Sequence, residues 1–157
     1  MSRLVAPAVE HEFERLLGRA QHDPHQLLGI HPSPEGAVVR AYVPYGGSPC
    51  VAVHGGTQAM RSIDRRGLFE LTLPGADVQV PYRLLLPDAA EPIDDPYRFL
   101  PSLGELDLHL LGEGQHRELG RVLGARVLEH EGVPGTSFAV WAPAARSVAL
   151  VGDCNRW

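Results

Sequence analysis

The stretch EGAVVRAYVPYGGSPCVAV, residues 35–53, decides the fold class of this chain. Its side chains alternate between two faces: Val39, Ala41 and Val43 share one face, and Val38, Arg40 and Tyr42 share the other. A period of two predicts a β-strand, because successive side chains of a strand point to opposite faces. The turn residues of YGGSP then lead to a second apolar run, CVAV at 50–53. The stretch therefore predicts two strands joined by a turn.

Further strands are predicted toward the C-terminus. LFELTLP at 68–74 and VPYRLLLP at 80–87 are short apolar runs, bounded by turn residues in HGGTQ, DRRG and PGAD. The 17 glycines and 14 prolines favour many turns, and hence short strands. Several short strands at this spacing predict a mainly β chain with an immunoglobulin-like antiparallel β-sandwich.

Short helices are expected beside this sandwich. Residues 8–18 form the first, with one apolar face made of Val9, Phe13, Leu16 and Leu17. A helical turn follows, with Asp23 as its N-cap, Pro24 in its first position and Gly29 at its end. Residues 31–36 are expected to be a loop on composition alone. A last helix is predicted over residues 115–123, inside a turn-rich connector.

The chain contains an internal repeat. PGTSFAVWAPAARSVALVG, residues 134–152, matches residues 35–53 at a constant offset of 99 positions. Gly36 then corresponds to Gly135, Pro44 to Pro143 and Tyr42 to Trp141; upstream, QHDPHQLLG resembles QHRELGRVLG at a slightly smaller offset. The first copy continues through more strands after CVAV, whereas only six residues follow the corresponding run SVALV at 147–151. We therefore expect a complete sandwich over residues 1–100, a connector with a short helix over 101–124, and the first hairpin of a second, incomplete sandwich over 125–157.

That second hairpin is expected to pair the strand of Phe138 and Val140 with the strand of Val148 and Leu150. A two-stranded hairpin is marginally stable alone and leaves unpaired edges and an uncovered apolar face. The expectation is that the natural protein continues, or that a partner completes the sheet.

Composition excludes several classes of function. The formal net charge of −5 gives no electrostatic footprint for nucleic acid or anionic lipid. The N-terminus has no apolar run long enough for a signal peptide or a membrane span. Cys50 and Cys154 form no CxxC pair, which fits a reducing compartment, and we expect a cytoplasmic protein. No cofactor is expected, because YGGSP and VHGGT lack the helix and lysine of a phosphate-binding loop.

Three sequence features suggest chemistry, and each has a structural alternative. HDPH at 22–25 is a possible metal pair, but a capped helix start is favoured. EPIDDP at 91–96 offers paired carboxylates, but turn capping is favoured over acid–base catalysis. Tyr42, Trp141 and Trp157 are aromatic side chains suited to stacking on a sugar ring. For Tyr42 and Trp141, packing against a neighbouring domain or the connector is favoured, and Trp157 is favoured as a plug in a core whose other half is missing. No catalytic or metal-binding residue is assigned, and the carbohydrate-binding residues stay unassigned.

The motifs together resemble bacterial glycogen branching enzymes (1,4-α-glucan branching enzymes). DPHQLLGIHP with VVRAYVP resembles the extra N-terminal module of that family, and DPYRF with LGELDLHLLGEG resembles its linker. FAVWAP followed by VALVGD and NRW resembles the start of the glycogen-binding-type β-sandwich that precedes the catalytic barrel. The resemblance covers nearly the whole chain. Cys154 departs from it, since the family usually has Phe there, and the smaller side chain would weaken packing in the second sandwich.

The resemblance implies a function. The parent enzyme transfers α-1,4-glucan segments to form α-1,6 branches in glycogen biosynthesis, and its N-terminal modules help to bind glucan and influence the transferred chain length. Its Asp nucleophile and Glu acid/base lie in a barrel that these 157 residues do not contain, so this polypeptide is expected to be inactive alone. The expected partners are an α-glucan and the catalytic barrel in cis. The alternatives are a stand-alone carbohydrate-binding or regulatory module acting with a separate catalytic chain, and a structural spacer.

Overall fold

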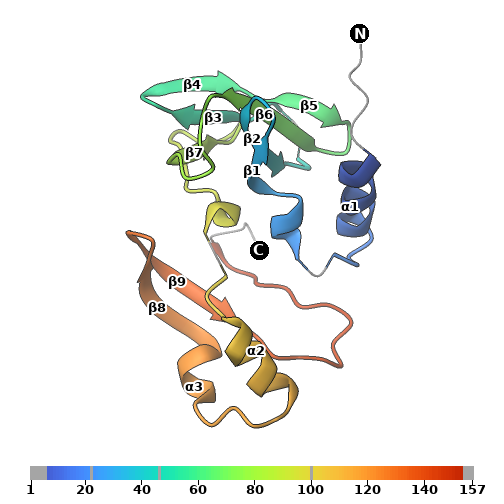
Figure 1. The fold of residues 1–157 in the computed structure, drawn as a ribbon, viewed down its shortest axis with the longest axis vertical. Coiled ribbons are helices and arrows are strands. Elements are labelled where there is room, and N and C mark those ends of the chain that lie inside the picture. The colour runs from blue at the N-terminus through green and yellow to red at the C-terminus, as the bar shows by residue number, and fades with distance from the viewer. Residues whose placement is uncertain (1–6, 22, 46, 100, 154–157) are drawn as a thin grey trace. The chain divides into compact units, whose positions relative to one another are not determined.

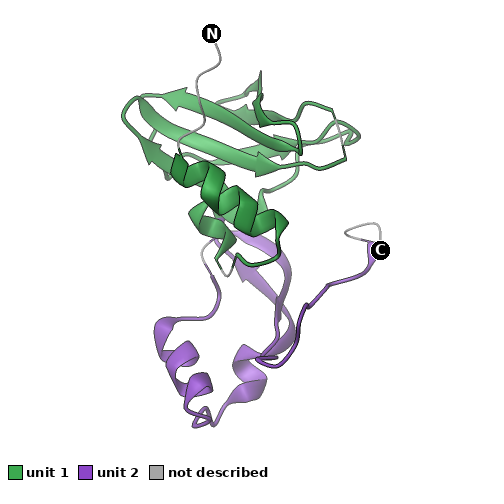
Figure 2. Ribbon diagram, turned by 90° about the vertical axis from the view of Figure 1, so that its right-hand side faces the viewer, with its two compact units in different colours: residues 1–98 green, residues 99–157 purple. Residues whose placement is uncertain are grey.

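The computed structural model describes residues 7–21, 23–45, 47–99 and 101–153 (Figure 1). It divides into two compact units, residues 1–98 and 99–157, which are coloured separately in Figure 2. Each unit is described by itself.

Unit 1 contains two antiparallel sheets. The first has the order β1-β2-β6-β5 and comprises β1 (Gly29–Ser33), β2 (Gly36–Tyr42), β6 (Leu68–Pro74) and β5 (Arg61–Asp64). The second has the order β4-β3-β7 and comprises β4 (Gly56–Ala59), β3 (Cys50–Val53) and β7 (Tyr82–Leu85). All neighbouring strands in both sheets run antiparallel, so the mainly β, antiparallel sandwich class is confirmed.

The main core of unit 1 is contributed by both sheets: β2 supplies Val39 and Ala41, and Val43 follows directly after β2. Val51 and Val53 of β3 and Tyr82 and Leu84 of β7 belong to the same cluster. The alternation predicted for residues 38–43 is therefore correct: Val39, Ala41 and Val43 lie in the sandwich core.

Helices cover the other face of the first sheet. Helix α1 (Pro7–Leu17) and the 3₁₀ helix η1 (Pro24–Gln26) frame a second cluster of Phe13, Leu27, Leu28 and Leu68. Arg66 holds α1 in place, because its guanidinium bonds Glu14 of α1 and Asp64 at 2.6 and 2.8 Å and lies over the Phe13 ring. The predicted cap is also present: the Asp23 carboxylate accepts from the backbone N–H of His25 at 3.2 Å.

Several local predictions for unit 1 are wrong. Residues 31–36, expected as a loop, contain most of β1, a two-residue turn and the start of β2. HGGTQ, expected as a turn, forms a turn only at 54–55 and then the first three residues of β4, whose four residues are all exposed. Strand β5 was also not predicted. Hydrogen bonds to neighbouring strands, rather than an apolar pattern, create these edge strands, so no period of two marks them.

Unit 2 consists of helices α2 (Glu105–Gly112) and α3 (Leu119–Val122) and the hairpin of β8 (Gly124–His130) and β9 (Val133–Ala139). The helix predicted over 115–123 is shortened to α3, and α2 falls in a segment expected to be irregular. The predicted pairing of residues 138–140 with residues 148–150 is wrong. β9 pairs with β8 instead, and residues 140–153 form no strand.

The internal repeat is visible in the backbone. Gly29 lies opposite Arg40 and Gly124 lies opposite Ala139, at positions that correspond in the two copies. Both glycines follow a leucine and have nearly the same positive φ, 87° and 88°. Each hairpin closes through a two-residue turn, at 34–35 and at 131–132. The β8–β9 hairpin is therefore the counterpart of β1–β2, with seven residue pairs where β1–β2 has five.

Candidate functional site

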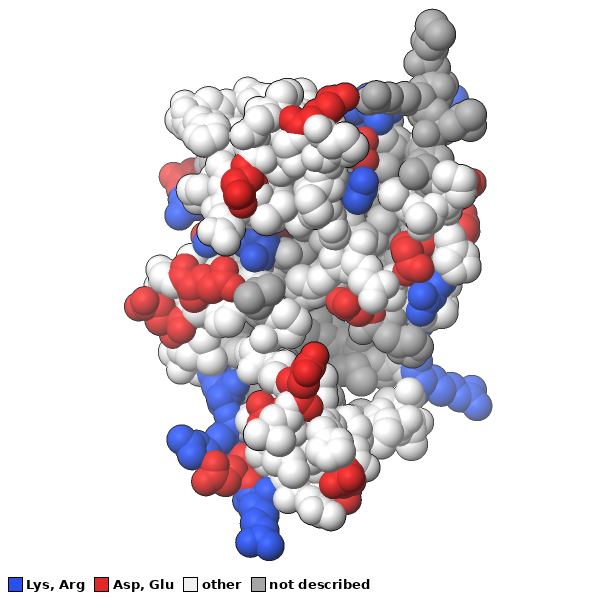
Figure 3. All heavy atoms as spheres, in the orientation of Figure 1, with Lys and Arg blue, Asp and Glu red and all other residues white. Residues whose placement is uncertain are grey.

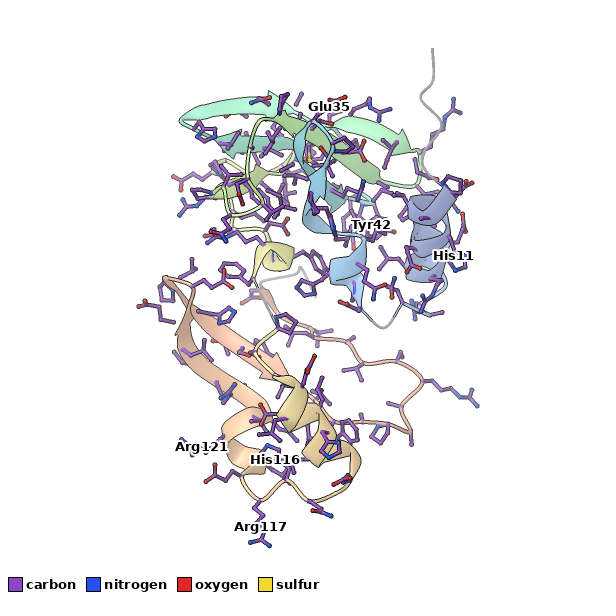
Figure 4. The ribbon with its side chains drawn as sticks, in the orientation of Figure 1. His11, Glu35, Tyr42, His116, Arg117 and Arg121 are labelled. Carbon is purple, nitrogen blue, oxygen red and sulfur yellow. The ribbon has the colours of Figure 1, made fainter. Side chains whose placement is uncertain are left out.

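Tyr42 is a packing residue. It lies between the first sheet and α1, as its label in Figure 4 shows, and its ring meets the Phe13 ring edge-on at 5.7 Å. Arg66 covers Phe13 in turn, with its guanidinium carbon 5.2 Å from the ring centre. Tyr42 thus packs against protein, but against α1 of its own unit rather than against the neighbouring domain or connector that was favoured.

Trp141, the counterpart of Tyr42 in the repeat, is not covered in this way. Its side chain is 47% exposed, two residues beyond the end of β9. Trp157 lies outside the described residues, as does Cys154. Of the three candidate sugar-stacking aromatics, Trp141 alone combines a described position with an open ring.

HDPH has the capped helix start that was favoured for it. His22 lies outside the described residues, and Asp23 caps η1. The His25 ring contacts Tyr97 edge-on, with ring centres 5.5 Å apart. Within the described ranges, no three His, Cys, Asp or Glu side chains gather as a metal site would need.

The carboxylates of EPIDDP stabilise the end of unit 1. Asp95 is 1% exposed; Tyr82 donates its hydroxyl proton to Asp95 Oδ2 at 2.6 Å, and the Tyr97 N–H donates to Oδ1 at 2.9 Å. Asp94 forms ion pairs with Arg83 at 3.6 Å and Arg98 at 3.4 Å. Both carboxylates are engaged with neighbouring protein groups, so turn stabilisation accounts for this motif better than acid–base chemistry does.

Burial sets the protonation behaviour of this region. Removal from water disfavours the charged form, so it raises the pKa of Asp95, and the hydrogen bonds from Tyr82 and Tyr97 only partly oppose this effect. The pKa of the Tyr82 hydroxyl is also raised, first by burial and then by the neighbouring Asp95 charge. Sequence reasoning missed this centre, although the alternation of VPYRLLLP signalled the inward position of Tyr82.

In unit 2, a histidine joins the two helices. His116 is largely buried, and its Nε2 donates to Asp107 Oδ1 of α2 at 3.0 Å while its Nδ1 accepts from the Glu118 N–H at 3.2 Å. Figure 4 shows His116 with Arg117 and Arg121 around α3. The bond from His116 is the main cause of the lowered pKa of Asp107. These contacts hold α2 and α3 together in place of an apolar core.

The two units differ in how well they bury their apolar side chains. Of the described hydrophobic residues that are buried, all but Leu111 lie in unit 1. The large hydrophobic side chains exposed on unit 2 are Leu106, Leu108, Leu119, Val127, Phe138, Val140, Trp141, Val148, Leu150 and Val151. Those exposed on the described part of unit 1 are Tyr45, Val78 and Ile93.

Charge gives no comparable signal. On the face of the molecule in Figure 3, acidic and basic side chains of unit 1 are interspersed, and neither sign forms a continuous track there. The basic side chains are all arginines, because the sequence contains no lysine. The described helices include none with the length and apolar character that a membrane span requires.

An antiparallel β-sandwich followed by a second hairpin of the same design defines a modular class of β-domain. Comparison with known families makes this class specific. Residues 9–97 match the family model described as alpha-1,4-glucan branching enzyme GlgB, N-terminal domain. Residues 122–157 match carbohydrate-binding module 48, described as the isoamylase N-terminal domain. The chain belongs to the family of the N-terminal domain of GlgB branching enzymes.

Curated relatives agree with this assignment. The chain is 47% identical over 156 residues to 1,4-alpha-glucan branching enzyme GlgB 1 of Streptomyces coelicolor. The matched region covers 98% of this chain and 20% of that protein. It is 46% identical to the GlgB enzyme of Thermobifida fusca, over 93% of this chain and 20% of the relative. It is 42% identical to the GlgB enzyme of Myxococcus xanthus, over 95% of this chain and 21% of the relative. The chain thus spans about a fifth of the length of these relatives.

Proposed function

We propose that this chain provides the glucan-binding N-terminal part of a 1,4-α-glucan branching enzyme that acts in the cytoplasm in glycogen biosynthesis. Its reaction would cut an α-1,4-linked glucan and rejoin the released segment through an α-1,6 bond. The chain itself would bind the α-glucan and influence the length of the transferred segment. Support comes from the family membership, the carbohydrate-binding module matched by residues 122–157, and the names of the relatives.

The observation that carries the proposal is the uncovered apolar surface of unit 2. Phe138 and Val140 are 51% and 65% exposed, whereas their counterparts in the repeat, Val39 and Ala41, are 0% and 4% exposed. A surface that is closed in one copy and open in the other needs further protein to cover it. We propose that the protein covering this surface is the rest of the enzyme, including its catalytic barrel, joined to this chain in cis.

The proposed division of the chain follows the same reasoning. Residues 1–100 act as an independent sandwich module, residues 101–124 connect it, and residues 125–157 begin the carbohydrate-binding module. The connector includes α2 and α3, whose exposed Leu106 and Leu119 extend the apolar surface.

Glucan binding by the full 157-residue protein tests the proposal. Electrophoresis through gels containing glycogen should retard the protein, and gels containing dextran, an α-1,6-linked glucan, should retard it less. Bovine serum albumin in the same gels corrects for sieving. Equal mobility in gels with and without glycogen would exclude glucan binding by this chain.

A further inference from the structure

The repeat separates the exposed apolar residues of unit 2 into two groups. Phe138 and Val140 correspond to Val39 and Ala41, which lie in the core between the sheets of unit 1. Their exposure is therefore explained by an open sandwich face. Trp141 corresponds to Tyr42, which belongs to the other cluster, on the opposite face of the first sheet. Covering the sandwich face of unit 2 does not account for Trp141.

The helix contact that buries Tyr42 is also not repeated. Phe13 and Leu108 each lie 16 residues before the glycine that starts their hairpin, Gly29 or Gly124. Leu108 of α2 therefore corresponds to Phe13 in the repeat. Phe13 is 1% exposed and touches Tyr42, whereas Leu108 and Trp141 are 50% and 47% exposed. Neither structural role of the first copy explains the open indole.

The backbone at the start of β8 has open space next to Gly124. Ala139 lies opposite Gly124, and a Cβ added at Gly124 would meet no atom within 4 Å. In unit 1, a Cβ at the corresponding Gly29 would lie 2.4 Å from the Tyr97 carbonyl oxygen. The space that the backbone of Tyr97 fills in the first copy is thus open in the second.

Polar groups for a ligand are present on the same face. Arg126 lies two residues after Gly124, opposite Ser137, and so shares the face of Gly124 and Ala139. Its Nη1 donates to the Arg121 carbonyl, whereas its Nε is buried and has no hydrogen-bond partner among the described residues. The Ser137 hydroxyl, 3.2 Å from the Ser102 hydroxyl, adds a donor and an acceptor. An unpartnered buried donor is costly unless a ligand or water accepts from it.

We infer that Trp141, with Arg126 and Ser137 at its side, forms a glucosyl-binding subsite of unit 2. The apolar C–H face of a glucose ring stacks on the indole, while ring hydroxyls accept from Arg126 and exchange hydrogen bonds with Ser137. The inference rests on the proposed function, because it names the place where the α-glucan binds.

A maltoheptaose titration of the full chain carrying Trp157→Phe tests this subsite. Trp141 is then the sole tryptophan, so its fluorescence should change saturably as the sugar binds. In glycogen gels, Trp141→Ala should weaken binding roughly tenfold, and Trp141→Phe, which keeps a flat ring, should restore part of the affinity. Phe138→Ala and Tyr45→Ala remove exposed aromatic rings elsewhere, and both should bind within about twofold of the parent.

The outcomes separate the two proposals. If the unaltered chain binds glycogen and Trp141→Ala binds equally well, the subsite is wrong and the proposed function stands. If Phe138→Ala loses as much affinity as Trp141→Ala, the aromatic effect is not specific to Trp141, and the subsite is again wrong. If the unaltered chain binds no glucan, both proposals fail. Circular dichroism of each variant confirms that the fold of the chain is retained.

Discussion

Tyr82 of β7 donates a buried hydrogen bond of 2.6 Å to Asp95, thirteen residues further along the chain. Asp95 also accepts from the N–H of Tyr97, which lies in the 3₁₀ helix η2 (Pro96–Arg98). The second sheet of the sandwich is thereby tied to the last segment of unit 1. The backbone of Tyr97 in turn closes over Gly29 at the start of β1. One buried carboxylate thus fixes the end of unit 1 against both of its sheets.

Removing the Tyr82 hydroxyl should destabilise unit 1. Tyr82→Phe leaves Asp95 buried with one acceptor unpaired, which costs about 1–3 kcal/mol. Urea denaturation followed by far-UV circular dichroism measures the loss in free energy of unfolding. Tyr45→Phe, which removes an exposed hydroxyl, is the control and should change stability little. Equal stability of the two variants would show that the Tyr82–Asp95 bond is energetically neutral.

The raised pKa of Asp95 should make stability depend on pH in a definite direction. Between the unfolded value, about 3.9, and the higher folded value, the folded state binds more protons than the unfolded state. Asp95 therefore lowers the free energy of unfolding as the pH rises through this window. Asp95→Asn cannot ionise, so its stability relative to the parent should improve as the pH rises from about 4 toward neutrality. A constant difference between the two proteins across this range would contradict the prediction.

Gly29 should tolerate no side chain. Gly29→Ala combines an unfavourable φ of +87° with a Cβ only 2.4 Å from the Tyr97 carbonyl oxygen. Gly55→Ala is a matched control in the same unit, because its φ is +74° but nothing lies within 4 Å of its Cβ. Each variant should lose about 1–2 kcal/mol to the backbone conformation, and Gly29→Ala should lose clearly more. Equal decreases in melting temperature for the two variants would mean that η2 moves away from the new Cβ without a loss of stability.

Unit 1 should fold without unit 2. A polypeptide ending at Phe99 retains both sheets and both buried clusters, so it should give one cooperative thermal transition. In the full chain, amide hydrogen exchange should protect residues 38–43 strongly and residues 140–151 weakly, because residues 140–153 form no strand. A broad, non-cooperative melt of the shorter polypeptide would contradict a domain boundary near residue 100. Strong protection of 140–151 in a proven monomer would show that this segment is covered from within the chain.

The 157-residue polypeptide alone should form no α-1,6 linkages in amylose. Of its adjacent carboxylates, Asp95 is buried in hydrogen bonds and Asp94 is paired with Arg83 and Arg98. Proton NMR of amylose incubated with the pure protein measures new branch points directly. Any increase over a heat-treated sample would require catalytic groups within this chain.

The sequence by itself determined the elements whose pattern depends on local chemistry. The alternation of residues 38–43 marked β2 and its buried face, and Asp23 with Pro24 marked the start of η1. The offset between Gly36 and Gly135 revealed the repeat, because equivalent turns need equivalent residues. Motif resemblance supplied the family.

Only the tertiary structure decided which strands pair and which aromatic rings are covered. Residues 137–139 pair with β8 rather than with the apolar run near Leu150, because a two-residue turn at 131–132 brings β8 alongside. Tyr42 and Trp141 occupy equivalent positions, yet Phe13 covers one and Leu108 leaves the other open. The sequence around Asp95 predicts a turn residue, and only the fold places the Tyr82 hydroxyl within hydrogen-bond distance of it. Strand pairing, ring packing and burial depend on contacts between residues far apart in sequence. A local sequence pattern does not show which distant residue makes the contact.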